Sequence, residues 1–225
     1  MIPIRDAVPS RTRPIVTLAL VATSASVTVL FSLLQTGRPG ASTLTGALGT
    51  GGAQGPAPTL WALLWLVRPS GWFQAVACAI ALWIFGPTVE DRVGHGRFVV
   101  LYAGCAVTAA AAVAAFGSMP ITAVVLLPGA VGGVIGAHAA LYPRARILML
   151  VPVAQGLDVS DVPAVLVAGL WVVAQLAGAL AHGVFLVAWS PGLALVQMAA
   201  GIVSGAAAAS VLRRPERMHV EWWHP

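Results

Sequence analysis

Long uncharged stretches alternate with short polar segments along the whole chain. Stretches of about 20 residues without a charge match the length of α-helix that crosses a bilayer. The fourth of the predicted helices is expected to begin inside its apolar stretch, near Pro128, because proline suits the first turn of a helix and not its middle. The pattern as a whole predicts six membrane-spanning helices, at about residues 15–34, 72–85, 98–116, 128–142, 162–181 and 192–212.

The segments between these helices are predicted to be loops, and two of them have a distinctive composition. In the predicted loop at residues 36–71, residues 36–58 are rich in Gly, Thr, Ser and Pro, and residues 60–67 hold two tryptophans one turn apart. Because tryptophan rings prefer the membrane interface, residues 60–67 are predicted to form an interfacial helix, with packing inside the loop as the alternative. Residues 90–97 carry both acidic and basic side chains and are predicted to form an exposed connector with local ion pairs, each worth about 0–1 kcal/mol.

The distribution of arginine predicts the orientation of the chain. If residues 1–14 form a cytoplasmic lead and residues 213–225 a cytoplasmic tail, all 12 basic residues except Arg38 and Arg68 lie in inner segments. Such an excess of arginine is typical of cytoplasmic segments. We therefore expect one membrane domain over residues 15–212 in a plasma membrane, with both termini inside and the loop at 36–71 outside.

The composition narrows the class of protein to an all-α membrane protein. Hydrophobic residues make up 59% of the chain and charged residues 8%, which leaves too little polar surface for a soluble domain. The net charge of +5 does not indicate nucleic-acid binding, because the arginines lie between the predicted helices. Cys78 and Cys105 lie in apolar stretches and are predicted to be buried free thiols. No cofactor is expected, and no group of His, Cys, Asp and Glu has the spacing of metal ligands.

Several motifs resemble those of the rhomboid family of intramembrane serine proteases. The most specific of them is LWIFGPTVEDRVGHGRF at residues 82–98. The others are MIPIRD and RPIVT at residues 1–6 and 13–17, GVIGA at 133–137, YPRAR at 142–146 and GLWVVAQL at 169–176. The resemblance covers nearly the whole chain, and the opening motif is similar to that of bacterial members. It implies a compact six-helix bundle with a partly embedded first loop and a short fourth helix that starts at mid-membrane.

The resemblance also implies where the catalytic residues would stand. Rhomboid proteases hydrolyse peptide bonds with a serine–histidine pair, and nearby donors stabilise the oxyanion. The serine position falls on Pro128, the histidine position on Met198, and the family's His-x-x-x-Asn pair on Gln74 and Cys78. Proline has neither a hydroxyl nor a backbone N–H, and a thioether is no general base. All four positions therefore depart from the catalytic pattern of the family.

Shifting the alignment restores neither catalytic residue. No serine lies between Ser118 and Ser160, and no histidine lies between His182 and His219. His138 and His182 are the histidines of the apolar stretches, and they are predicted to be a core residue and an interfacial residue respectively. The alternative is that they carry protons, since ionisable groups within a membrane are candidates for function.

Glycines spaced three and four residues apart indicate that the fourth and sixth helices pack closely. Such spacing puts the glycines on one face of a helix and lets a neighbouring backbone approach. The glycines concerned are Gly132, Gly133 and Gly136 in the fourth helix and Gly201 and Gly205 in the sixth, where they match the family's Gly-x-x-x-Gly motif.

These observations predict a rhomboid-fold pseudoprotease whose partners are the lipid bilayer and the transmembrane segments of client membrane proteins. One alternative is an active intramembrane hydrolase with a relocated site, which would use Thr122 with His138 or His182. A pathway for ions or small molecules ranks lowest, because no Asp, Glu or Arg is predicted at mid-membrane.

Overall fold

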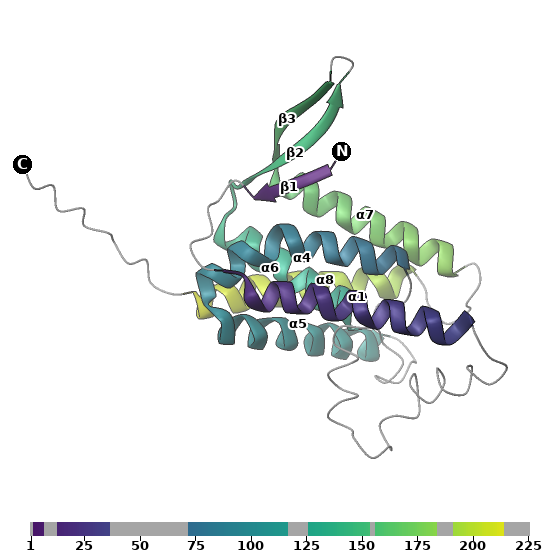
Figure 1. Cartoon of the computed structure of the whole chain (residues 1–225). Helices are drawn as coiled ribbons and strands as arrows, with labels where there is room; N and C mark the ends of the chain where they lie inside the picture. Colours follow the sequence, from purple (N-terminus) through teal and green to yellow (C-terminus); the bar gives the residue numbers. More distant parts are fainter. Residues whose placement is uncertain are drawn as a thin grey trace, which may run out of the picture.

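The computed structural model describes residues 2–6, 13–36, 72–116, 126–153, 156–183 and 191–213, and the structural statements below refer to these residues. In this part of the chain, the helices form one bundle and a small sheet lies at one side of it (Figure 1). The predicted loop at 36–71, with its interfacial helix at 60–67, lies outside the described residues. The helices are α1 (Ile15–Thr36), α4 (Trp72–Val93), α5 (His95–Phe116), α6 (Leu127–Leu141), α7 (Ala164–Gly183) and α8 (Pro191–Leu212).

Three of these helices, α4, α5 and α8, are long and apolar enough to cross a membrane. The other three contain shorter apolar segments, at Ile15–Leu30, Leu127–Leu141 and Ala164–Gly178. Large hydrophobic side chains on the outside of the bundle, such as Val100 and Leu170, are more than half exposed, as suits a surface that faces lipid. The chain therefore has the helical character of a membrane protein.

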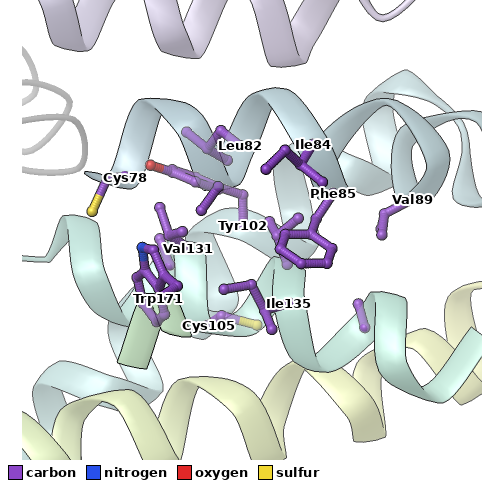
Figure 2. Close-up of a cluster of buried hydrophobic side chains, with 14 of the residues drawn as sticks. Cys78, Leu82, Ile84, Phe85, Val89, Tyr102, Cys105, Val131, Ile135 and Trp171 are labelled. Carbon is purple, nitrogen blue, oxygen red and sulfur yellow. The ribbon is translucent and has the colours of Figure 1, made fainter. Parts of the chain in front are cut away.

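Helix α6 lies in the middle of the bundle, against α4, α5, α7 and α8 (Figure 1). Every residue from Leu127 to His138 is buried. The helix begins at Leu127 with Pro128 in its first turn, as the position of the proline predicted. Figure 2 shows Val131 and Ile135 of this helix packed with side chains of α4, α5 and α7 in the hydrophobic core.

A three-stranded antiparallel sheet corrects the prediction of an all-α fold. Its strands are β1 (Ile2–Asp6), β2 (Arg146–Val153) and β3 (Gly156–Pro163), in the order β1-β2-β3. Ile147 and Met149 of β2 are buried in the core of the bundle, which fixes the inner face of the sheet. Strands β2 and β3 follow each other in the chain, but β1 lies far before them, so no local pattern could reveal that β1 pairs with β2.

The predicted exposed connector at 90–97 is also wrong. Helix α4 continues through Glu90 to Val93, and α5 starts at His95, so Gly94 alone separates the two helices. Gly94 has a φ of 89°, a backbone conformation that glycine adopts without a steric penalty. The chain therefore turns between the two helices at one residue, and Glu90 belongs to a helix.

Glu90 is completely buried and joins α4 to the start of α1. Its carboxylate accepts hydrogen bonds from the backbone N–H groups of Val16, at 2.9 Å, and Thr17, at 2.8 Å, and from the Thr17 hydroxyl at 2.6 Å. The first N–H groups of a helix have no partner within the helix, and a carboxylate there is also favoured by the helix dipole. His95 Nδ1 lies 2.6 Å from the same carboxylate. Glu90 is therefore a side-chain cap supplied by a different helix.

Candidate functional site

Pro128, to which the resemblance assigned the serine position, is buried near the start of α6. The Ala130 N–H donates to the Leu126 carbonyl oxygen at 3.1 Å, so the first turn of α6 closes around the proline. The side chain has no hydroxyl and the backbone has no N–H. The start of α6 therefore offers neither a nucleophile nor an amide donor at this residue.

Helix α8 brings Gln197 and Met198 to this part of α6. A Cβ atom at Gly129 would lie 3.4 Å from Gln197 Cγ, and one at Gly132 would lie 3.2 Å from the Met198 carbonyl oxygen. Both Gln197 and Met198 are buried. An amide and a thioether do not take up protons in the physiological range, so neither residue supplies a general base.

The glycines of α6 and α8 let the two backbones touch. A Cβ atom at Gly136 would collide with the carbonyl of Ile202, and one at Gly205 would collide with the carbonyl of Gly133. A Cβ atom at Gly201 would collide with the Gly129 carbonyl oxygen. The contacts hold the Pro128 end of α6 and the Met198 region of α8 next to each other.

A hydrogen bond between two buried side chains joins α4 to α7. Gln175 Nε2 of α7 donates a hydrogen bond to Cys78 Sγ of α4 at 3.6 Å, and both residues are buried. Gln74 lies one turn before Cys78 on α4 and is half-buried. The two positions that the resemblance assigned to oxyanion stabilisation therefore lie on the side of α4 that approaches α7, with a glutamine opposite one of them.

Sequence reasoning missed three polar residues at this site. Gln175 and Gln197 are buried, and Trp171 is buried with an indole N–H that has no hydrogen-bond partner among the described residues. Figure 2 shows Trp171 in the same cluster as Cys78 and Tyr102. The two glutamines could have been singled out from the sequence, because each places an uncharged amide in an apolar helix, and such a group needs a hydrogen-bond partner inside a membrane.

His138 lies far along α6 from Pro128. Ten residues separate them, which corresponds to about 15 Å along a helix axis. The buried His138 ring meets Phe85 edge to face, with ring centroids 5.0 Å apart, and lies 5.6 Å from the ring of Tyr142. His182 belongs to α7, and its side chain is outside the described part of the structure. His138 is thus a residue of the aromatic core.

The serine hydroxyls of α8 bond to their own helix. Ser204 donates to the Gly201 carbonyl oxygen at 3.0 Å and accepts from the Thr108 hydroxyl at 2.9 Å. Ser210 donates to the Ala207 carbonyl oxygen at 2.7 Å.

The remaining candidates from the sequence give no further site in the described residues. Thr122 is not among these residues, and within them no group of three or more His, Cys, Asp or Glu side chains lies close enough together to bind a metal ion. Cys78 and Cys105 are buried free thiols, as predicted.

Comparison with known families identifies the domain that contains these helices. The model of the Rhomboid domain matches residues 60–215 of the chain. The chain belongs to the rhomboid family. No curated protein and no solved structure matches it. The matched segment contains α4 to α8, and therefore holds every position of the rhomboid catalytic pattern discussed above, while β1 and α1 precede it.

Proposed function

We propose that this rhomboid is a pseudoprotease that binds transmembrane segments of client membrane proteins. The observation that carries the proposal is that Pro128 and Met198, to which the resemblance assigns the family's serine and histidine positions, are both buried and lack a hydroxyl and an imidazole. Loss of a catalytic serine and histidine lowers the rate of a serine hydrolase by many orders of magnitude. The glycine contacts between α6 and α8 nevertheless keep the framework of the site.

Support for client binding comes from the seam between α4 and α7. The ring of Phe73 on α4 lies 3.1 Å from where a Cβ atom of Gly178 on α7 would be, and the Cys78–Gln175 hydrogen bond uses a weak sulfur acceptor. Trp171 adds a buried N–H donor that has no partner in the described part of the chain, and such a donor costs about 1–3 kcal/mol until an acceptor reaches it. A carbonyl oxygen of a client helix between α4 and α7 would be such an acceptor.

The proposed setting is a plasma membrane with both termini in the cytoplasm. The excess of arginine in the inner segments supports it. In this orientation α1 and α7 begin at the cytoplasmic end of the bundle, and α4, α6 and α8 end there. The sheet then belongs to the cytoplasmic side.

Purified protein in nanodiscs is expected to neither cleave a rhomboid model substrate nor react with a fluorophosphonate probe, because no serine hydroxyl lies at Pro128. The measurement is substrate cleavage on gels and probe labelling by mass spectrometry, with an active rhomboid protease as the positive control. If the wild-type protein does cleave the substrate or react with the probe, and this activity persists in Pro128→Ala, the proposal is contradicted. Loss of this activity in His138→Ala or His182→Ala would instead favour a relocated hydrolase site.

Cross-linking α4 to α7 is expected to abolish client binding. Phe73→Cys and Gly178→Cys, placed in a Cys78→Ser, Cys105→Ala background, put two thiols across the seam. After reaction with a short, reducible thiol cross-linker, binding of a fluorescent transmembrane peptide should fall at least about tenfold and return on reduction. Each single-cysteine variant is the matched control. Unchanged binding by the cross-linked protein would exclude this seam as the client site.

A further inference from the structure

The strand β3 has one edge without a partner in the described part of the chain. The sheet order is β1-β2-β3, so β3 pairs with β2 along one edge only. Pairing with β2 is continuous from Arg146 opposite Pro163 to Val153 opposite Gly156. A regular edge strand of this kind presents a row of backbone N–H and C=O groups to which another extended segment can pair.

The position of β3 connects this edge to the seam between α4 and α7. Strand β3 ends at Pro163 and α7 begins at the next residue, Ala164, whose N–H donates to the Ala145 carbonyl oxygen at 3.0 Å. Helix α7 contacts β2 and β3, and α4 contacts β1 (Figure 1). The sheet therefore bridges the ends of the two helices between which a client helix is proposed to lie.

The acidic residues of β3 indicate that a strand added at its free edge would be basic. The strand contains Asp158 and Asp161 and no basic residue, and Asp161 is exposed, as is its neighbour Ser160. The nearest arginine of the paired strand, Arg146, stands opposite Pro163 at the end of the ladder. The middle of the edge strand is thus acidic, whereas the segments that follow transmembrane helices on the cytoplasmic side are rich in Lys and Arg.

We infer that the free edge of β3 binds the basic cytoplasmic segment that adjoins the transmembrane helix of a client, as an added β-strand. This inference rests on the proposed function, because it places the end of the client helix at the α4–α7 seam. Backbone pairing gives the added strand its affinity, and the exposed Asp161 favours a basic segment over others. A client is then held at two places, by its helix within the bilayer and by its flanking segment at the sheet.

The test uses the full chain in nanodiscs and three peptides with the same transmembrane helix of about 20 leucine and alanine residues. One carries a tail of alternating arginine and valine, one a glycine–serine tail, and one the basic tail with alternate backbone nitrogens methylated. The basic tail should increase affinity about tenfold over the glycine–serine tail, which is the effect of one or two net hydrogen bonds. Methylation should remove most of this gain, because it blocks strand pairing without changing charge.

Substitutions in the sheet distinguish the effect of the charge of β3 on peptide binding from a loss of binding caused by a destabilised sheet. Replacing Asp158 and Asp161 by Asn should reduce the gain to about threefold or less. Asp6→Asn, on the strand at the opposite edge, is the matched control and should leave the gain unchanged. A photo-cross-linking residue at Ser160 should capture the basic tail.

The outcomes distinguish this inference from the proposed function. Equal affinity for all three peptides overturns the inference and leaves client binding intact. Absence of binding by any peptide overturns both. Cross-links from position 160 to a second copy of the chain, or to residues 214–225 of the same chain, in place of the tail would also overturn it.

Discussion

Gly205→Ala is expected to destabilise the folded protein by about 3 kcal/mol, because one added methyl group must push two helix backbones apart. The new Cβ atom would collide with the carbonyl group of Gly133, and no side-chain rotamer can relieve a clash with backbone. Helix α8 would have to move away from α6 along the face that also contains Gly129 and Gly201. The measurement is reversible unfolding in mixed micelles, followed by circular dichroism.

Gly104→Ala is the matched control and should have the opposite sign. Gly104 is a helical glycine of α5 with no atom within 4 Å of the position that a Cβ would take. Alanine is intrinsically more favourable than glycine in a helix by about 0.8–1.0 kcal/mol, so this variant should be at least as stable as the wild type. Equal stability of the two variants would mean that the α6–α8 contact tolerates separation without cost.

Glu90→Ala is expected to destabilise the protein by about 3–5 kcal/mol, which is the loss typical of removing one member of a buried charged network. The substitution leaves the N–H groups of Val16 and Thr17 and the Thr17 hydroxyl without their acceptor. Faster hydrogen exchange at the Val16 and Thr17 amides should accompany the loss in unfolding free energy, because the first turn of α1 loses its cap.

Glu90→Gln is the informative comparison for this cap. The amide retains one acceptor oxygen but lacks the charge, so we expect roughly half of the loss in unfolding free energy. If Glu90→Ala unfolds at the same detergent composition as the wild type, with unchanged exchange at Val16 and Thr17, the cap contributes nothing to stability. The pair of variants thus separates hydrogen bonding from charge.

The approximate positions of the helices followed from the sequence, because a helix that crosses a bilayer needs about 20 apolar residues, and α4, α5 and α8 meet this requirement. The start of α6 could also be predicted, since Pro128 limits what can precede and follow it. The ends of helices were less certain. Helix α4 extends to Val93 and includes the buried Glu90, whose carboxylate accepts hydrogen bonds from the start of α1, a segment distant in the sequence.

The candidate site shows the same division. The sequence alone led to the prediction that Pro128 and Met198 stand at the family's serine and histidine positions, because rhomboid-like motifs surround both residues. That Gln175 meets Cys78, and that Gln197 lies against Gly129, depends on how α7 and α8 are rotated about their axes. Apolar helices without a strongly polar face leave this rotation undetermined in the sequence.

The sequence by itself determined the membrane class, the approximate positions of the helices and the resemblance to rhomboids, and from this resemblance came the prediction that the catalytic serine and histidine are replaced. The tertiary structure alone decided that β1 and β3 flank β2, that Glu90 caps α1, and that a Cys78–Gln175 contact joins α4 to α7. The physical reason is range. Hydrophobic length is a property of each segment, whereas the pairing of β1 with β2, capping by another helix and helix rotation arise only when segments distant in the chain meet.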